Sequence, residues 1–483
     1  MRYQLCLLLL LFINFAGGIA TIAATESSPQ QTQTPPPNIV LILCDNLGYG
    51  DIGCYHAGSR DLTPHIDKMT AHGIKFTDAY AAAPVCTPSR AALLTGCYPR
   101  RVGLDLTPGQ GAVLRPGSPY GLNPSEITLA EILKSKGYAT LCIGKWHLGD
   151  QLEFFPTRQG FDHFFGIPYS DDMTTNAKRN FPTMPWMQDE NVALADDDLS
   201  LFTQRGTDRA VAFMEEHRDQ PFFLYFPQVT PGSTTRPPVS PDFQEKSHRD
   251  RWSDSIMELD WSVGRILESL DRLGLSERTL VLFTSDNGAP FAGTKNIGSN
   301  LPLKGHAYSV AEGGMRMPLI AHWPGRIPAG SVSSEMVTLM DLFPTIANLA
   351  GAEIPTDRTI DGRDILPLLL GDANAKSPHE AFYFYFLNQL QAVRSGPWKL
   401  YLPNEMGLVG FGPQTAPQPG RLFHLVDDPE ERHDRFDDQP DVVKRLLALG
   451  ASARDDLGDR DLPGKNVRPF GKIENPTLRL LNP

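Results

Sequence analysis

The stretch NIVLILCDN, residues 38–46, is apolar from Ile39 to Cys44 and then ends abruptly in Asp45 and Asn46. Three later stretches have the same pattern, an apolar run followed by polar or turn-forming residues: YATLCIGKWH (138–147), PFFLYFPQVTP (221–231) and TLVLFTSDN (279–287). Apolar runs without polar alternation, bounded by turn-forming residues, are typical of strands buried on both faces of a mainly parallel sheet. The four stretches therefore predict the centre of a large sheet.

Helical segments separate these runs. The stretch PSEITLAEILKSKG (124–137) offers Ser125 as an N-cap and Gly137 just past the helix end, and residues 254–274 carry apolar side chains at helical spacing. Strands alternating with helices predict an α/β fold whose sheet is sandwiched by helices. Because ligands in such sheets bind beyond the carboxyl ends of the strands, we expect the polar residues after the four runs to meet.

The sequence changes character after about Phe386. LQAVRSGPWKLYLP and GRLFHLVDD are typical of short antiparallel strands, and PDVVKRLLALGASARDDL is typical of a closing helix. We therefore predict a large α/β domain over residues 38–385 and a smaller α+β domain over residues 386–483.

The N-terminus has the features of an export signal. In residues 1–24 an arginine precedes an apolar run that ends in small residues, and this run is short for a membrane span. An uncleaved anchor is the alternative. Residues 25–37 are rich in Gln, Thr and Pro and predict a disordered spacer. We expect an exported protein, periplasmic or secreted, without a stable membrane span.

Charge and cysteine content limit the partners and the chemistry. The net charge of −12 argues against nucleic acid, which requires a basic face, although a few local cations could hold a small anion. Of the six cysteines, Cys6 lies in the predicted signal. The odd remainder predicts at least one unpaired or modified cysteine in an oxidising compartment. The sequence leaves open which residues pair among Cys44, Cys54, Cys97 and Cys142.

Two acid–amide pairs each close a predicted strand, Asp45 with Asn46 and Asp286 with Asn287. One such pair would be explained by its tendency to form turns. Two pairs at one edge of a sheet favour a metal site, because calcium and magnesium prefer oxygen ligands.

A pocket for an anion is predicted next to these pairs. In PVCTPSRAALLTG, residues 84–96, Cys86 lies where a helix begins and Arg90 lies one helical turn later. A helix N-terminus with Arg90, Lys145, Lys304 and His147 would suit a tetrahedral dianion. Each residue alone has a structural explanation, such as a solvated lysine or a packed histidine, so their shared location is the argument.

Cys86 itself has two explanations that the residues do not separate. It could be a thiolate nucleophile, activated by the helix dipole and nearby cations. It could instead be a structural cysteine paired with Cys97 or Cys54.

CTPSR followed by AALLTG resembles the C-x-P-x-R signature of type I sulfatases, in the alkaline phosphatase superfamily. Further matches run in order along nearly the whole mature chain: CDNLGYGDIG, LTPHIDKMTAHGIKFTDAY, GKWHLG, GFDHFFGIPYS, TSDNG, EGGMRMPLIAHWPG and RSGPWKLYL. Within that family the motifs resemble those of arylsulfatases and N-acetylgalactosamine-6-sulfatases. The resemblance implies an alkaline-phosphatase-like fold, with residues 38–385 as the catalytic domain.

The resemblance also implies a modified nucleophile. A maturation enzyme would oxidise Cys86 to Cα-formylglycine, whose aldehyde becomes hydrated. One hydroxyl of the hydrate would attack sulfur as the alcohol leaves, and the second would then expel sulfate. Calcium, with magnesium as the alternative, would bind the oxygen ligands Asp45, Asn46, Asp286, Asn287 and the modified Cys86.

The remaining roles follow from the same resemblance. Arg90 would hold the formylglycine and metal region, and His147 would handle the proton of the formylglycine hydroxyl. The residues that contact sulfate or substrate would be Ser170, Lys145, Lys304 and His306.

Two positions depart from the family pattern. Asn46 stands where the family usually has a second aspartate, which predicts weaker metal binding. Gly232 is the nearest match to a histidine that usually protonates the leaving oxygen, and no histidine occurs between His217 and His248. Either His248, His306 or another residue replaces it, or the enzyme is slow on carbohydrate esters, because a positioned acid contributes about 10²–10⁴-fold.

The leading hypothesis is an exported, calcium-dependent sulfatase that acts on a sulfated carbohydrate or an aryl sulfate. A phosphate or phosphonate monoester hydrolase is the first alternative. The second is a catalytically weak protein that only binds sulfated glycans.

Overall fold

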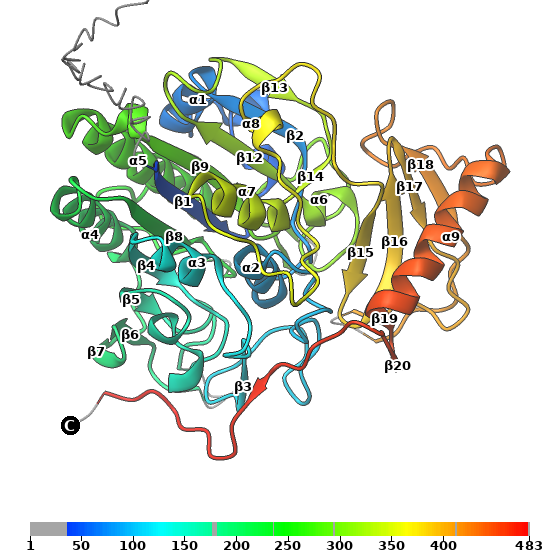
Figure 1. The fold of residues 1–483 in the computed structure, drawn as a ribbon, viewed down its shortest axis with the longest axis horizontal. Helices are drawn as coiled ribbons and strands as arrows, with labels where there is room; N and C mark the ends of the chain where they lie inside the picture. The colour runs from blue at the N-terminus through cyan, green and yellow to red at the C-terminus, as the bar shows by residue number, and fades with distance from the viewer. Residues whose placement is uncertain (1–35, 176–180, 235, 293–294, 411–412, 482–483) are drawn as a thin grey trace, which may run out of the picture. The chain divides into compact units, whose positions relative to one another are not determined.

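The four apolar runs form neighbouring strands at the centre of one large sheet, seen in the computed structural model of Figure 1. The structure describes residues 36–175, 181–234, 236–292, 295–410 and 413–481. The four strands are mutually parallel and lie in the order β9 (Thr279–Ser285), β1 (Asn38–Asp45), β8 (Phe222–Pro231) and β4 (Ala139–Lys145). Every residue of β1, β8 and β9 is buried, which explains why these runs lack polar alternation.

The full sheet has eleven strands in the order β13-β2-β12-β9-β1-β8-β4-β5-β6-β7, and β14 pairs with β2. Antiparallel pairing occurs where β12 joins β2 and β9, and where β6 joins β5 and β7. The outer strands are β2 (Ile74–Tyr80), β5 (His163–Ile167), β6 (Pro185–Gln188), β7 (Asn191–Ala195), β12 (Arg316–His322), β13 (Ser331–Ser333) and β14 (Val337–Thr338). The predicted mainly parallel sheet is confirmed.

Helices cover both faces of this sheet (Figure 1). One face packs against α1 (Pro64–Ala71), α4 (Phe202–Glu216) and α5 (Arg251–Arg272) through one apolar core. The other packs against α2 (Cys86–Thr95), α3 (Leu129–Ser135) and α7 (Leu342–Leu349) through a second core. The short helices are α6 (Glu312–Met315) and α8 (Leu366–Leu369). The α/β sandwich is therefore also confirmed.

The N-cap predicted for α3 is wrong. Thr128, not Ser125, caps this helix, because the Thr128 hydroxyl accepts from Glu131 N at 3.2 Å while Glu131 accepts from Thr128 N at 2.7 Å. Gly137 follows the helix end with a left-handed φ of 81°, the conformation that favours glycine there.

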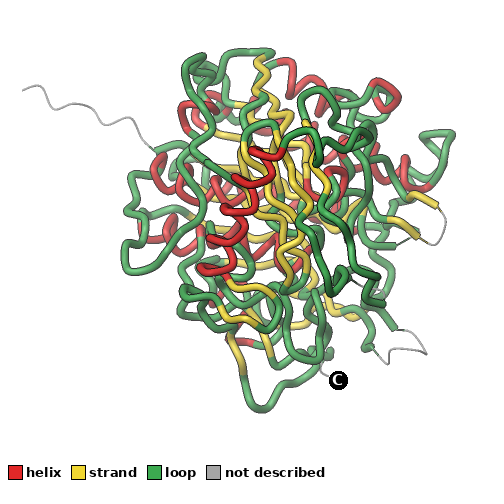
Figure 2. Tube along the Cα trace, turned by 90° about the vertical axis from the view of Figure 1, so that its right-hand side faces the viewer, coloured by secondary structure: helices red, strands yellow, loops and turns green. Residues whose placement is uncertain are grey.

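A second, four-stranded antiparallel sheet follows in the chain (Figure 2). It consists of β15 (Phe382–Phe386), β16 (Gln389–Ser395), β17 (Trp398–Tyr401) and β18 (Arg421–His424), and α9 (Pro440–Leu457) packs on it. The first strand begins at Phe382, before the predicted boundary at residue 386. A third apolar core joins this sheet to residues near the start of α2, including Tyr80 and Val85.

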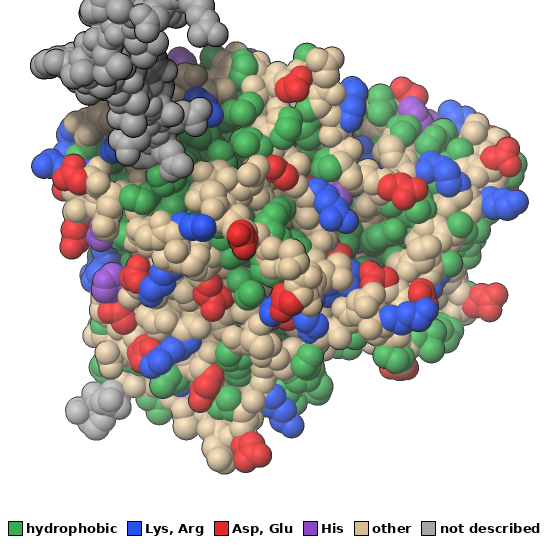
Figure 3. Space-filling model, in the orientation of Figure 1, with side chains coloured by type: hydrophobic (Ala, Val, Ile, Leu, Met, Phe, Trp, Pro, Cys, Tyr) green, Lys and Arg blue, Asp and Glu red, His purple; other side chains and the backbone are tan. Residues whose placement is uncertain are grey.

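The end of the chain returns to the large domain, where β21 (Gly471–Lys472) pairs with β3 (Tyr120–Gly121). Acidic and basic side chains are interspersed over the face seen in Figure 3. In the described part of the chain no helix combines the length and the apolar character that a membrane span needs. The predicted signal peptide and most of the predicted spacer lie outside the described residues.

Candidate active site

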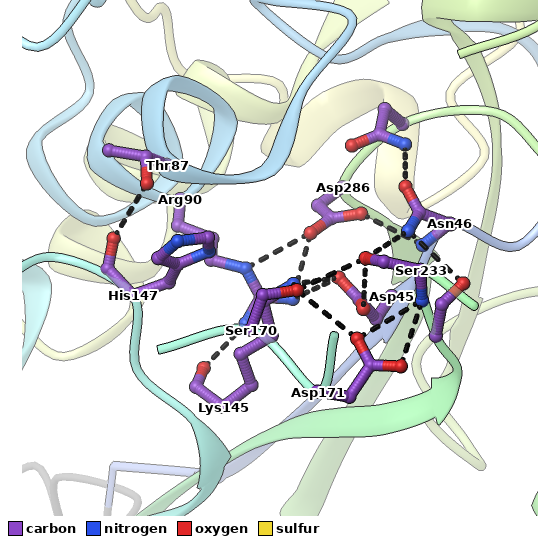
Figure 4. A network of polar contacts seen from close by, with 12 residues as sticks. Asp45, Asn46, Thr87, Arg90, Lys145, His147, Ser170, Asp171, Ser233 and Asp286 are labelled. Atoms are coloured by element: carbon purple, nitrogen blue, oxygen red, sulfur yellow. Dashed lines mark hydrogen bonds and ion pairs between the residues drawn. The ribbon is translucent and has the colours of Figure 1, made fainter. Parts of the chain in front are cut away.

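Arg90 lies at the centre of a buried polar network at the carboxyl ends of β1, β4 and β9 (Figure 4). Its Nη2 is 3.0 Å from Asp45 Oδ1 and 2.7 Å from Asp286 Oδ2, and its Nη1 donates to the Lys145 carbonyl oxygen at 2.5 Å. All three charged side chains are fully buried. The arginine on α2 therefore joins three strand ends that are far apart in the sequence.

Lys145 is the second buried cation of the network. Its Nζ is 2.7 Å from Asp45 Oδ1 and donates to Ser170 Oγ at 3.0 Å. Burial alone would raise the pKa of Asp45, but Lys145 and Arg90 hold this pKa below its usual value. Asp45 therefore stays ionised, and Lys145 keeps its charge because burial, which would lower its pKa, is outweighed by the acidic groups around it together, with Asp45 contributing most.

The two amides of the predicted metal set lie next to these carboxylates. Asn287 Nδ2 donates to Asn46 Oδ1, and Asn46 N donates to Asp286 Oδ1 at 3.1 Å. Asn287 Oδ1 is buried without a hydrogen-bond partner, which is the environment of an oxygen that a cation could satisfy. Among the described residues no group of three or more His, Cys, Asp or Glu side chains is arranged to hold a metal. The four oxygen-bearing residues, two acids and two amides, nevertheless fit a hard cation.

Two residues of the network were not predicted from the sequence. Ser233 Oγ accepts from Asn46 Nδ2 at 2.9 Å and lies 3.1 Å from Ser170 Oγ. The Asp171 carboxylate accepts from Ser233 N and from Ser170 Oγ, each at 3.1 Å. Burial and the charge of Asp45 raise the pKa of Asp171 to about 7. Asp171 directly follows Ser170 and Ser233 directly follows Gly232 in the sequence, and this adjacency could have indicated both residues.

His147 follows β4 with a left-handed φ of 61° and is buried. Its Nε2 lies 2.9 Å from the Leu114 carbonyl oxygen, so Nε2 carries the hydrogen and Nδ1 carries the lone pair. Nδ1 has no hydrogen-bond partner among the described residues. Burial and then the charges of Lys145 and Arg90 lower the pKa of His147 well below its usual value, so the ring is neutral and can accept a proton.

Cys86 begins α2 and lines a cavity of about 610 Å³. The residues lining it are Cys86, Val113, Arg115, His147, Ser170, Asp172, Met173, Phe181, Ser233 and Tyr308. Cys86 is a free thiol, as are the four other described cysteines, so the disulfides with Cys54 or Cys97 are not formed. Burial raises the pKa of the Cys86 thiol to about 12, which is opposite to the lowered pKa expected of a thiolate nucleophile.

Three other residues named from the sequence lie outside this network. Lys304 Nζ donates to the Glu431 carbonyl oxygen at 3.1 Å, and His306 stacks on Phe291 with ring centroids 4.8 Å apart. His248 lines a different cavity, between residues 244 and 254. Among the described residues, the histidine in the wall of the Cys86 cavity is His147.

A mainly parallel α/β sheet that gathers buried cations, oxygen ligands and a helix N-terminus at one edge defines the alkaline-phosphatase-like class of ester hydrolases. Comparison with known proteins narrows this class. The sulfatase family model matches residues 37–352, and the model of the N-sulphoglucosamine sulphohydrolase C-terminal region matches residues 308–448. The chain belongs to the sulfatase family of sulfuric ester hydrolases.

Individual relatives agree with this assignment. Arylsulfatase A of Homo sapiens is 38% identical, with 86% of this chain and 87% of the relative covered. N-acetylgalactosamine-6-sulfatase of Canis lupus familiaris is 37% identical, with coverages of 88% and 84%. The solved structure of the PsFucS1 sulfatase from Pseudoalteromonas sp. has a TM-score of 0.74 at 29% identity and covers 88% of this chain and 92% of that one. The resemblance stated from the sequence is confirmed.

Proposed function

We propose that this sulfatase removes sulfate from a carbohydrate or aryl ester, with a formylglycine made from Cys86 as nucleophile and calcium as its metal. The observation that carries the proposal is the place of Cys86, at the start of α2 in the wall of a cavity that also exposes His147 and Ser170. Its raised thiol pKa disfavours an unmodified thiolate at neutral pH, whereas an oxidised side chain does not depend on that ionisation.

A hydrated formylglycine would supply one hydroxyl for attack on sulfur and a second for the release of sulfate. Lys145, fixed by Asp45, would stabilise charge on the sulfate oxygens, and the Ser170 hydroxyl beside it would orient them. The lone pair on His147 Nδ1 would accept the proton of the reacting hydroxyl. Arg90 would hold the charged residues beneath Cys86 in place.

A calcium ion, with magnesium as the alternative, would be held by Asp45, Asn46, Asp286 and Asn287 next to residue 86. When bound it would supply positive charge to the sulfate oxygens. Lys304 and His306 remain predicted substrate contacts, although their side chains contact other groups in this structure.

The cavity wall supports a ring-shaped substrate. Val113 and Met173 offer apolar surface, while Arg115 and Asp172 offer charge, a mixture that suits a sugar or an aromatic ring carrying polar groups. The export signal expected in residues 1–24 would bring the chain to a periplasmic or secreted location. A formylglycine-generating enzyme would be its maturation partner.

The test combines mass spectrometry with an activity panel. Protein expressed with a maturation enzyme should show the mass of formylglycine in the peptide containing residue 86. It should also release sulfate from defined sulfated sugars or aryl sulfates, with Cys86→Ala as the blank. Faster release of phosphate than of sulfate from matched aryl esters would favour the phosphatase alternative. Full conversion without release from any ester would favour the binding protein.

A further inference from the structure

Ser233 lines the Cys86 cavity beside Ser170, and its hydroxyl contacts both Asn46 and Asp45. Asn46 Nδ2 donates to its Oγ at 2.9 Å, and this Oγ lies 3.4 Å from Asp45 Oδ2. Figure 4 shows Ser233 within the polar network, next to Asn46 and Ser170, and the same residue lines the Cys86 cavity. Its position raises the question of where its own hydrogen points.

The backbone turn that carries Ser233 is fixed from two sides. Asp171 accepts from Ser233 N at 3.0 and 3.1 Å, and Asn46 Nδ2 donates to the Gly232 carbonyl oxygen at 3.1 Å. Gly232 has a left-handed φ of 94°, and a Cβ atom there would lie 2.5 Å from Asp171 Oδ2. A side chain at position 232 would crowd Asp171, whereas the side chain of the next residue, Ser233, lines the cavity.

The hydroxyl hydrogens of Ser170 and Ser233 have different acceptors. Lys145 Nζ donates to Ser170 Oγ, and Ser170 in turn donates to Asp171 Oδ1 at 3.1 Å, so the Ser170 hydrogen is already committed. Ser233 Oγ accepts from Asn46, and its own hydrogen points to Ser170 Oγ at 3.1 Å or to Asp45 Oδ2 at 3.4 Å, both longer than the about 2.7–2.8 Å typical of a hydroxyl donor. A ligand oxygen in the cavity would be a better acceptor for it.

We propose that the Ser233 hydroxyl donates a hydrogen bond to the oxygen that links sulfur to the departing alcohol, with Asn46 and Asp171 as positioning residues. The assignment rests on the proposed sulfatase function. In the proposed function Lys145 stabilises charge on the sulfate oxygens, whereas a neutral donor suits the linking oxygen, which gains charge only as its bond to sulfur breaks. Ser233 keeps its proton, and the departing oxygen takes its proton from water, the second substrate of the hydrolysis, so the serine ends each turnover unchanged.

The experiment compares full-length, matured Ser233→Ala with the parent enzyme on a series of sulfate esters whose alcohols range from 4-nitrophenol to a simple alkanol. We expect kcat/KM to fall about 10- to 100-fold for the alkyl ester and less than about 3-fold for the nitrophenyl ester. A poor leaving group depends on the donor far more than a good one does. Ser233→Thr, which keeps the hydroxyl, should restore most of the activity on the alkyl ester.

Two measurements test whether the loss of activity comes from incomplete maturation or from weaker calcium binding. The conversion of Cys86, followed by mass spectrometry, and the calcium affinity, followed by titration calorimetry, should be the same in Ser233→Ala and in the parent. Ser240→Ala is the matched control, because Ser240 is buried and lies outside the cavity wall, so kcat/KM should not change. If Ser233→Ala does not fold, Ser233→Cys keeps the volume and weakens the donor, and it should show the same dependence on the leaving group at smaller size.

Equal losses on all esters, no loss, or a loss that follows weakened calcium binding would each overturn the assignment while leaving the sulfatase proposal intact. A fully converted parent enzyme that hydrolyses no sulfate ester would overturn the proposed function and this assignment together.

Discussion

Replacing Gly232 by alanine tests the geometry of the turn that carries Ser233. A non-glycine residue in the left-handed region costs about 1–2 kcal/mol. The added Cβ would also lie 2.5 Å from Asp171 Oδ2 and 3.0 Å from the Val229 carbonyl oxygen. Relief of such overpacking costs about 1–3 kcal/mol. We therefore expect Gly232→Ala to lower the free energy of unfolding by roughly 2–5 kcal/mol.

The chain offers a matched control for the backbone part of this cost. Gly137 has a similar φ of 81°, but nothing lies within 4 Å of a Cβ built there. Gly137→Ala should therefore lose only the conformational share, about 1–2 kcal/mol. Urea unfolding followed by tryptophan fluorescence measures both variants. If the two losses agree within about 0.5 kcal/mol, Asp171 does not crowd position 232 and our account of the turn is wrong.

Three further predictions concern other buried groups. Burial raises the pKa of Glu258 to about 7, so the folded protein binds this proton more tightly than the unfolded chain, and the resulting stabilisation is lost as pH rises. The unfolding free energy of the parent relative to Glu258→Gln should therefore fall by up to about 3 kcal/mol between pH 4.5 and 7.5. A difference that does not change with pH would contradict this prediction. Lys399→Met removes the cation that lies 2.9 Å from the buried carboxylate of Glu312 and 3.1 Å from that of Glu431. It should lower the free energy of unfolding in urea by about 3–5 kcal/mol. Lys376→Met, at an exposed ion pair, should change this free energy by less than about 1 kcal/mol. Asn46→Asp adds a negative charge, so titration calorimetry should show tighter calcium binding. Because the substitution also removes the amide that holds residue 233, kcat/KM on an alkyl sulfate should fall. Unchanged or weaker calcium binding would refute the predicted effect of the added charge.

The parts of the site that lie on regular elements could be predicted from the sequence. Asp45 and Lys145 are the last residues of their strands, and Asp286 directly follows another. The apolar runs of these strands are evident in the sequence, and parallel pairing brings their ends together. Arg90 follows Cys86 by one helical turn, so its place required only that a helix begin at residue 86. These positions depend on local pattern and on one topological rule, which is why they could be inferred.

The parts that depend on loop conformation could not be predicted in this way. Lys304 lies in a Gly-rich loop whose path takes its ammonium group to Glu431, and no periodicity specifies that path. The position of Ser233 depends on the left-handed backbone conformation of the preceding residue, Gly232. A run of polar residues in the sequence does not indicate that conformation. The cap of α3 is different, because Thr128 and Glu131 have the spacing of a capping box and a stricter use of that pattern would have chosen Thr128 over Ser125.

Asn46 and Gly232, the two positions predicted to depart from the family pattern, lie in direct contact, and this contact changes how each predicted departure is understood. Asn46 Nδ2 donates to the Gly232 carbonyl oxygen at 3.1 Å and to Ser233 Oγ at 2.9 Å, two bonds that a carboxylate could not make. An aspartate at position 46 would place negative charge against that carbonyl oxygen. A side chain at position 232 would collide with Asp171. Each predicted departure taken alone suggests a lost ligand or a lost acid, but together they form a turn that presents a hydroxyl to the cavity, which is the arrangement that the proposed role of Ser233 requires.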